Sequence, residues 1–307
     1  MPQEIAKEGQ VLIRTKAVAL NFPDLLMTYG KYQFKPDLPF VIGMEGAGVV
    51  VETGAGVKSF KVGDRVIFKG KTGATKRFIS VYEHNVSAAP SNLSFEEAAA
   101  FAVTFMTAYV SLVRRGRLVV GEKVLIMGAG GGVGQASVAV AKALGAEVVA
   151  AASQEDKLQI ASDSGADHLV NYHKSDLTAA ILEVTNGAGV DLILDPVGGD
   201  LLRPALDALK PFGRALIVGF ASGGFGDVDL ETLRDNAQEI IGVRAGEYGR
   251  RNLEAGISAW QELVNLTEAY HLKPHIGKVW GEEEVADALV AMEHREVAGK
   301  QVIRLTE

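Results

Sequence analysis

Residues 122–153 read EKVLIMGAGGGVGQASVAVAKALGAEVVAAAS, and this stretch decides the fold of the chain. The apolar run Val124–Met127 ends at a cluster of glycines. A segment with helical periodicity follows and closes at Gly145, and a second apolar run, Val148–Ala152, comes directly after it. A strand, a tight turn, a helix and a second strand form a β-α-β unit, which implies a parallel sheet.

The glycine cluster fits the fingerprint of a dinucleotide-binding turn when it is read as Ala129-x-Gly131-x-x-Gly134. This register places a tight turn, a close approach to a pyrophosphate and a helix–strand contact in the required order, with alanine in the first slot. The helix then opens at about Gly132, and its N–H groups and dipole face the phosphates. We predict that Ala129, Gly131, Gly132, Val133 and Gly134 bind the cofactor. The alternative, an ordinary surface turn, fits the flanking strands and helix less well.

The tip of the second strand indicates which dinucleotide is bound. An NAD-preferring fold carries an acidic residue about 20 positions along, where it binds the ribose 2′-hydroxyl. Here residues 151–153 are Ala-Ala-Ser, and the acidic pair Glu155-Asp156 comes later, where it suits the first turn of the next helix. Ser153 can donate to a 2′-phosphate and Lys157 can neutralise it, so the sequence predicts NADPH. The alternative for Lys157 is a solvated helix lysine.

Composition narrows the class of protein. The 307 residues, 48% of them hydrophobic, are enough for two domains of ordinary size. The sequence has no apolar run of about 18 residues and no signal-peptide pattern, so we expect no membrane span and a cytoplasmic location. It contains no cysteine, which excludes disulfides and thiolate metal sites. A net charge of −7 argues against nucleic acid as a partner.

The rest of the chain divides into a β-rich part and an alternating part. Gln10–Val18 alternates apolar and polar residues, and short strands separated by glycine turns follow up to about residue 68, which predicts a small antiparallel barrel. Ser94 and Glu97 form a predicted capping box. From residue 123 onward, helices alternate with six strands, as in an open doubly wound sheet. We expect a dinucleotide-binding domain over residues 99–267 and a barrel domain over residues 1–98 and 268–307.

Several short motifs along the chain occur together in one known family. They are Asn21-x-x-Asp24, Gly43-x-Glu45-x-x-Gly48-x-Val50, Gly63-Asp64-Arg65-Val66, Thr104–Tyr109, Ala129–Gly134, Asp195–Gly199, Val218-Gly219 and Gly299-Lys300. Together they resemble the zinc-free quinone oxidoreductases of the medium-chain dehydrogenase/reductase superfamily, the zeta-crystallin-like group. The resemblance implies an α/β protein with a doubly wound, parallel six-stranded Rossmann sheet and a small GroES-like β-barrel domain. The family's first two strands have no counterpart before Gln10, which implies either a barrel open at one edge or a sequence that is shortened at its start.

The zinc-bearing relatives of this family place a cysteine where Asn21 stands and a histidine where Met44 stands. Neither side chain here can serve as that ligand, and the six histidines lack metal-type spacing, so we expect no metal site. Without a Lewis acid, the resemblance implies hydride transfer to a quinone or another α,β-unsaturated carbonyl. Polar donors should then lie near the substrate oxygen, and we predict Asn21, Tyr32 and Thr107 for this role.

The resemblance also assigns residues around the cofactor. Tyr172 resembles the family's tyrosine near the adenosine 2′-phosphate, and the alternative is a half-buried aromatic side chain at a strand end. Val197, Gly219, Phe220 and Ala221 lie at strand ends where backbone groups would meet the nicotinamide and its ribose. Thr104 is placed at the nicotinamide face, or else it caps within a helix connection. The family is usually dimeric through the edge strand of the nucleotide sheet, for which Glu239–Val243 is the apolar candidate.

Two further functions remain open from the sequence. A 2-enoyl thioester reductase shares the fold and the lack of zinc. A non-catalytic protein is a different class, because zeta-crystallin-like proteins can serve as lens structural proteins or bind single-stranded RNA. The acidic net charge and the intact nucleotide fingerprint disfavour this second alternative.

Overall fold

The computed structural model describes residues 4–306 of the chain, which form two compact units. Unit 1 contains the residues up to Val103 together with those from Lys273 onward, and unit 2 is Thr104–Leu272. The boundary therefore falls inside one helix, α3 (Ala102–Tyr109).

Unit 2 is built on a six-stranded sheet, and every strand pair in it is parallel. The strand order is β11-β10-β9-β6-β7-β8, so the chain starts in the middle of the sheet and winds outward in both directions. This confirms the predicted doubly wound fold. The strands are β6 (Lys123–Met127), β7 (Glu147–Ala152), β8 (His168–Asn171), β9 (Val190–Asp195), β10 (Leu209–Ile217) and β11 (Glu239–Gly242).

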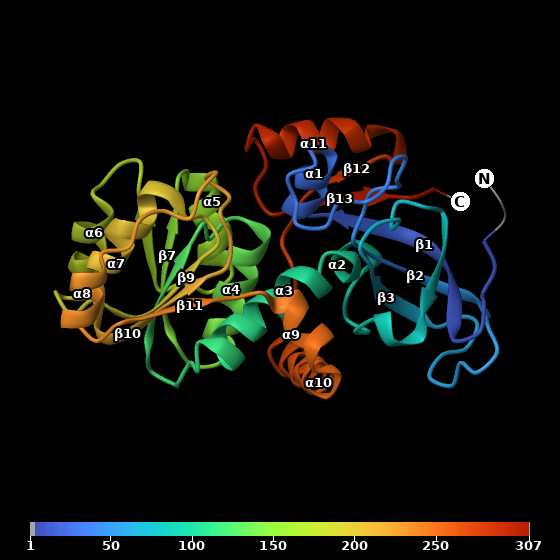
Figure 1. Ribbon diagram of the computed structural model, residues 1–307, viewed down its shortest axis with the longest axis horizontal. Coiled ribbons are helices and arrows are strands. Elements are labelled where there is room, and N and C mark those ends of the chain that lie inside the picture. The colour runs from blue at the N-terminus through green and yellow to red at the C-terminus, as the bar shows by residue number, and fades with distance from the viewer. Residues whose placement is uncertain (1–3, 307) are drawn as a thin grey trace. The chain divides into compact units, whose positions relative to one another are not determined.

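Helices cover both faces of this sheet, with α4 and α5 on one face and α6 and α7 on the other (Figure 1). The six-residue segment after α3 is a π-helix, η2 (Val110–Arg115), and η3 (Gly199–Leu201) is a 3-10 turn. The helices are α4 (Gly132–Ala143), α5 (Glu155–Asp163), α6 (Leu177–Val184), α7 (Leu202–Asp207), α8 (Leu230–Asp235), α9 (Ala245–Arg251) and α10 (Leu253–Tyr270).

Burial on both faces explains why the central strands are continuous apolar runs. All four side chains of Val124–Met127 are 0% exposed, as are those of Val148–Ala151. A parallel strand that is covered by helices on both sides must be apolar at every position, not at every second one. Each buried aliphatic side chain of this size stabilises the fold by roughly 1.5–3 kcal/mol. The core thus holds the strand ends, and the turns that follow them, in fixed places.

Unit 1 is a seven-stranded, mainly antiparallel sheet in the order β12-β13-β1-β2-β3-β5, with β4 paired to β1. This confirms the predicted GroES-like fold. Among the residues described, β4 pairs with β1 alone. The strands are β1 (Gln10–Leu20), β2 (Glu45–Thr53), β3 (Arg65–Lys69), β4 (Phe78–Tyr82), β5 (Val86–Ala88), β12 (Ile276–Trp280) and β13 (Lys300–Arg304).

Short helices complete unit 1. They are α1 (Phe22–Thr28), η1 (Glu83–Asn85), α2 (Phe95–Ala99), η4 (Glu282–Glu284) and α11 (Val285–Glu293), with the first residues of α3. The predicted capping box is present, because the Ser94 hydroxyl accepts from the Glu97 N–H at 3.1 Å and the Glu97 carboxylate accepts from the Ser94 N–H at 2.8 Å. Over residues 4–306, no helix is both long enough and apolar enough to cross a bilayer.

Candidate functional site

The glycine turn of unit 2 links the end of β6 to the start of α4. Gly128 has φ +60°, a left-handed conformation that glycine adopts without strain. Gly134 lies in the first turn of α4, and a Cβ there would lie 2.2 Å from the Gly128 carbonyl oxygen. Only glycine lets the helix approach the turn this closely, which is the contact expected of the third fingerprint glycine.

Gly131 differs from Gly134 because a side chain at this position would point into open space. It is the N-cap of α4, in extended conformation with φ −85° and ψ 166°. A Cβ at Gly131 would meet only the Gly128 carbonyl oxygen, at 3.4 Å. The turn therefore has open space on the side of Gly131, at the N-terminus of α4. That arrangement fits a pyrophosphate.

Hydrogen bonds bring the predicted adenosine-side residues to the same end of the sheet. The Ala129 N–H donates to the Ala151 carbonyl at 3.0 Å, and the Tyr172 N–H donates to the Ala152 carbonyl at 3.2 Å. The stem of Lys157 packs against the glycine turn, since a Cβ on Gly130 would lie 2.4 Å from the Lys157 Cβ. Ser153, which follows Ala152 directly, Lys157 and Tyr172 are all half-buried here.

The nearest acidic side chain after β7 is already engaged. The Glu155 carboxylate accepts from the Asn171 side-chain amide at 2.7 Å and pairs with Lys174 at 2.8 Å. The bonds to Lys174 and Asn171 lower the pKa of Glu155 from its ordinary value. Glu155 is thus an ionised carboxylate directed at its two partners on the β8 side.

The predicted nicotinamide-side residues lie in two turns at the carboxyl ends of β9 and β10. These turns are bonded to each other, because the Ala221 N–H donates to the Pro196 carbonyl at 3.2 Å and the Ser222 N–H to the Val197 carbonyl at 2.9 Å. A Cβ on Gly219 would lie 2.8 Å from the Pro196 carbonyl oxygen. Phe220 packs its ring against Phe225, with centroids 4.9 Å apart. The structure therefore brings Val197, Gly219, Phe220 and Ala221 together at one edge.

Asp195, which the sequence analysis did not select as a site residue, holds the first of these turns. Its Oδ1 accepts from the Val197 and Gly198 N–H groups at 2.7 and 2.9 Å. The side chain is 1% exposed, and its Oδ2 has no hydrogen-bond partner among the described residues. Burial raises the pKa of this carboxyl above its usual value. Asp195 therefore holds this turn through the Val197 and Gly198 amides.

The variants Asp195→Asn and Asp195→Ala should behave differently. Asparagine keeps an oxygen that accepts from both turn amides and replaces one unbonded polar group with another, so Asp195→Asn should remain close to the unmodified chain in stability. Alanine leaves the buried Gly198 N–H and the partly buried Val197 N–H without an acceptor, which should cost about 1–3 kcal/mol of unfolding free energy. Urea unfolding of both variants checks this prediction. Equal losses in the two variants would contradict it.

The predicted residues of α3 belong to unit 2. Thr104 is 2% exposed, and Thr107 is half-buried one turn further along the helix. The Thr107 carbonyl accepts from the Ser111 hydroxyl at 2.6 Å, in the π-helical turn that follows α3.

In unit 1, Asn21 belongs to a buried cluster of four polar side chains, which we call the polar hub: Asn21, Asp24, Glu45 and Lys300. The Lys300 ammonium donates to Asn21 Oδ1 at 2.7 Å, to Glu45 Oε1 at 3.0 Å and to the Leu20 carbonyl at 3.0 Å. The Asn21 Nδ2 donates to Glu45 Oε1 at 2.9 Å and to the Ala19 carbonyl at 3.3 Å. Donation from Asn21 to an acceptor molecule stays a prediction, and it requires one of the Nδ2 bonds to open.

Asp24 adds a second carboxyl to the polar hub. It is 0% exposed and accepts from the Asn21 N–H at 2.9 Å and from the Gly43 N–H at 3.2 Å. Burial raises the pKa of Asp24 to about 7, with Glu45 adding to the rise and Lys300 opposing it. At neutral pH the hub thus holds one ammonium against two carboxyls, one of them partly protonated.

The pH dependence of stability should report the titration of Asp24. Its pKa is about 7 in the folded chain against an ordinary 3.8, so the folded state binds more protons than the unfolded state between these values. The unfolding free energy should therefore fall as pH rises from about 4 to 7, with a slope of up to about 1.4 kcal/mol per pH unit from this one group. Asp24→Asn should flatten the slope, as measured by urea unfolding across this range. Asp64→Asn, a control at a partly exposed carboxylate, should leave the slope unchanged. Equal slopes in Asp24→Asn and in the unmodified chain would show that Asp24 does not cause the pH dependence.

Tyr32 lies in the irregular segment after α1 and is half-buried. Asn21 and Tyr32 belong to unit 1, whereas Thr107 belongs to unit 2.

The sequence analysis gave no role to Lys300, although it noted the pair Gly299-Lys300. The strand Lys300–Arg304 also contains Gln301 and Arg304, so its pattern did not mark Lys300 as a buried ammonium, which requires buried partners. Those partners could not be read from the sequence, because Asn21 and Glu45 lie 279 and 255 positions away along the chain.

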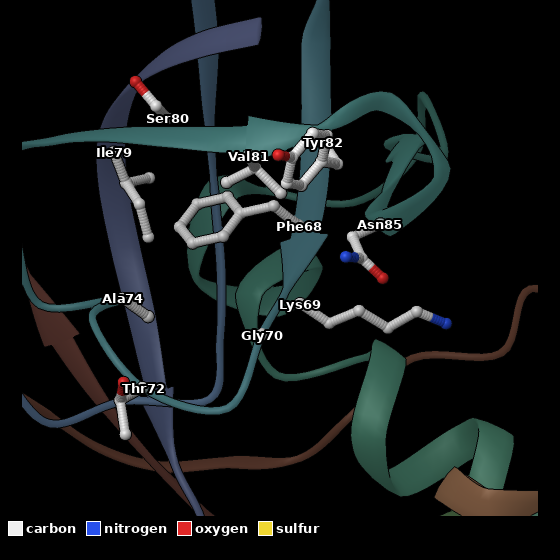
Figure 2. Close-up of a pocket in the computed structure, with 10 residues that line it drawn as sticks. All are labelled: Phe68, Lys69, Gly70, Thr72, Ala74, Ile79, Ser80, Val81, Tyr82 and Asn85. Carbon is white, nitrogen blue, oxygen red and sulfur yellow. The ribbon is translucent and has the colours of Figure 1, made fainter. Parts of the chain in front are cut away.

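A cavity opens in unit 1 between β3 and β4, where Phe68, Ile79 and Val81 line one side (Figure 2). Lys69, Thr72, Tyr82 and Asn85 supply polar groups around it. None of the predicted site residues lines this cavity. Among residues 4–306, no group of three or more histidine, cysteine, aspartate or glutamate side chains is arranged to hold a metal ion.

Two family models match the chain, one for each unit. Residues 7–91 match the alcohol dehydrogenase GroES-like domain, and residues 132–268 match the zinc-binding dehydrogenase model. The Bos taurus protein named quinone oxidoreductase-like protein 2 is 35% identical over 298 residues, which cover 96% of this chain and 85% of that protein.

Solved structures share the whole fold. Escherichia coli quinone oxidoreductase, whose crystal structure is complexed with NADPH, is 29% identical with a TM-score of 0.89, and the match covers 99% of this chain and 94% of that one. The CurK enoyl reductase is also 29% identical, with a TM-score of 0.88, over 100% of this chain and 94% of that one. The chain therefore belongs to the zinc-free, quinone oxidoreductase-like group of the medium-chain dehydrogenase/reductase superfamily.

Proposed function

We propose that this oxidoreductase uses NADPH to reduce quinones and other α,β-unsaturated carbonyls without zinc. The observation that carries the proposal is the glycine turn, where Gly131 leaves amides at a helix N-terminus open to a diphosphate and Lys157 packs beside them. The E. coli quinone oxidoreductase, described as complexed with NADPH, supports the same cofactor and acceptor class.

The residues at the carboxyl end of β7 support a preference for NADPH over NADH. Ser153 follows the strand, Tyr172 is bonded to the neighbouring Ala152, and the nearby Glu155 is occupied by Asn171 and Lys174. A 2′-phosphate at this tip would meet a hydroxyl and an ammonium, while the Glu155 carboxylate is paired with Lys174. The ribose of NADH would lack the carboxylate that usually binds its 2′-hydroxyl.

The residues of the chain would bind and orient the reactants. When bound, NADPH supplies a hydride, which a quinone takes up with one proton from solvent to become a hydroquinone. The glycine turn would hold the pyrophosphate, and the bonded turns at Val197 and Ala221 would hold the nicotinamide end. Tyr32, Asn21 and Thr107 are the proposed donors to the acceptor oxygen, where charge develops as hydride arrives.

The variant Lys157→Ala should discriminate between the two cofactors. Loss of a charge-assisted bond to the 2′-phosphate costs about 1.5–3 kcal/mol, so the KM for NADPH should rise roughly tenfold or more. The KM for NADH should barely change. Lys210→Ala, a control at the amino end of β10 where Lys210 pairs with Asp191, should leave both constants unchanged. Equal effects of Lys157→Ala on both cofactors would remove Lys157 from the phosphate site.

The reaction itself is tested by comparing two acceptors with NADPH. We expect turnover of 1,4-benzoquinone, followed as loss of absorbance by the reduced cofactor. The second candidate, a 2-enoyl thioester reductase, is favoured by the similarity to CurK enoyl reductase. Turnover of a crotonyl thioester without turnover of the quinone would establish this alternative. Cofactor binding without oxidation by any member of a broad acceptor panel would instead favour a non-catalytic role.

We also propose a cytoplasmic homodimer that pairs through β11. This strand lies at the edge of the six-stranded sheet and, in the described chain, pairs only with β10. A second copy could continue the sheet along its free edge. Light scattering of the purified chain should give twice the monomer mass of 32.5 kDa, and a strictly monomeric result at all concentrations would contradict the dimer.

A further inference from the structure

The polar hub lies where two helices of unit 1 begin. Asn21 precedes α1, and its N–H is held by the carboxylate of Asp24 in the first turn of that helix. Glu45 Oε2 accepts from the Val103 N–H at 2.8 Å, in the first turn of α3. The Lys300 ammonium links the residues at the two helix starts, because it donates one hydrogen bond to Asn21 Oδ1 and another to Glu45 Oε1.

The chemistry of the hub fixes the orientation of the Asn21 amide. An ammonium only donates and a carboxylate only accepts, so Asn21 must turn its oxygen to Lys300 and its nitrogen to Glu45. A rotated amide would place its NH2 against the ammonium and its oxygen against the carboxylate. Lys300 is 4% exposed and Glu45 is 0% exposed, so water offers neither group a replacement partner.

We infer that Lys300 is a positioning residue for Asn21, because its ammonium holds the Asn21 oxygen and the Glu45 carboxylate that together fix the Asn21 amide. The inference rests on the proposed function, in which Asn21 meets the acceptor. Lys300 itself makes three bonds within unit 1, to Leu20, Asn21 and Glu45. Its effect should therefore appear in turnover and not in binding of the cofactor to the glycine turn.

The absence of cysteine from the chain allows a specific test. Lys300→Cys introduces a single thiol, which 2-bromoethylamine converts under denaturing conditions into a thioether analogue of lysine. Iodoacetamide converts the same thiol into a neutral side chain. Both products are refolded, and the unmodified protein passes through the same treatment as a control.

The neutral side chain should lower kcat with 1,4-benzoquinone by roughly tenfold to a hundredfold, as expected for misplaced groups near a reaction, while the KM for NADPH stays unchanged. The lysine analogue should restore most of kcat. Unchanged kcat in the folded neutral protein, or failure of the ammonium to restore it, would overturn the role of Lys300.

Hydrogen exchange of the Asn21 side-chain amide provides a second readout that needs no turnover. Exchange should be slow in the unmodified protein and in the lysine analogue, and faster in the neutral product. Equal exchange rates in all three would overturn the inference. Absence of turnover with every quinone and enone would instead overturn the proposed function, and the exchange rates would still decide whether Lys300 holds Asn21. If the neutral product does not refold, Lys300→Met takes its place in this comparison, and exchange in Lys300→Met as slow as in the unmodified protein would overturn the inference.

Discussion

Gly131→Val is expected to lose tight binding of both NADPH and NADH while the chain remains folded. The extended conformation of Gly131, φ −85° and ψ 166°, is open to any residue, and the added Cβ would meet only the Gly128 oxygen at 3.4 Å. The side chain would instead fill the space proposed for the pyrophosphate. We expect the Kd for either cofactor to rise roughly 100-fold, or about 2.7 kcal/mol, by calorimetric titration.

Gly134→Ala, three residues away, should show the opposite behaviour. Its Cβ would lie 2.2 Å from the Gly128 oxygen and 2.7 Å from the Ala129 Cα, so backbone must move. Overpacking of this kind costs about 1–3 kcal/mol of unfolding free energy. Gly70→Ala is the control, because its Cβ would meet only the Thr72 oxygen at 3.5 Å, and it should change neither stability nor binding. Unchanged NADPH affinity in Gly131→Val would show that the pyrophosphate binds elsewhere.

Lys300→Met should cause the largest loss of stability among single changes in the polar hub. Methionine keeps much of the side-chain stem but removes the ammonium, which leaves the Glu45 carboxylate buried at 0% exposure without its counter-charge. Removing one partner of a buried ion pair costs about 3–5 kcal/mol. Urea unfolding measures the loss.

Two comparisons separate the buried charge from the lost side chain. The double variant Lys300→Met/Glu45→Gln carries no orphaned charge at position 45 and should lose less stability than Lys300→Met alone. Lys278→Met, on the neighbouring strand β12, removes an exposed lysine that lies over the Trp280 ring, and should cost about 1 kcal/mol or less. A loss for Lys300→Met no larger than for Lys278→Met would show that the hub is not a stabilising ion pair.

The sequence predicted the parts of the fold that local patterns determine. The strands Val124–Met127 and Val148–Ala152 are apolar at every position because helices cover both faces of their sheet. The glycine cluster between a strand and a helix is typical of a dinucleotide-binding turn. Ser94 and Glu97 lie three positions apart, so their reciprocal cap could be read directly.

Features that depend on distant partners could not be predicted in the same way. The strand β12 (Ile276–Trp280) has three exposed residues in succession, Gly277–Val279, and is defined by its pairing with β13 rather than by an alternating pattern. The short helix α9 (Ala245–Arg251) contains two glycines and three charged residues. The polar hub joins residues from both ends of the chain, and only the folded sheet brings them together.

The same limit applies to the candidate site. The predicted roles of Ser153 and Lys157 came from their spacing after the fingerprint, and the structure adds that Lys157 packs on Gly130. The bonds of Asn21 were invisible in the sequence, where the residue stood out only as a replacement for a metal ligand. Its proposed contact with the acceptor would have to replace one of the two hydrogen bonds that its amide nitrogen already makes.

Hydride transfer from NADPH to an enone tests the central claim most directly. NADPH whose transferable hydrogen on C4 is replaced by deuterium is mixed with the purified chain, an α,β-unsaturated ketone and a metal chelator. The product is analysed by mass spectrometry. The account predicts a saturated ketone with deuterium at the β-carbon, formed at a rate that the chelator does not change. A product without deuterium, or turnover that the chelator abolishes and zinc restores, would contradict it.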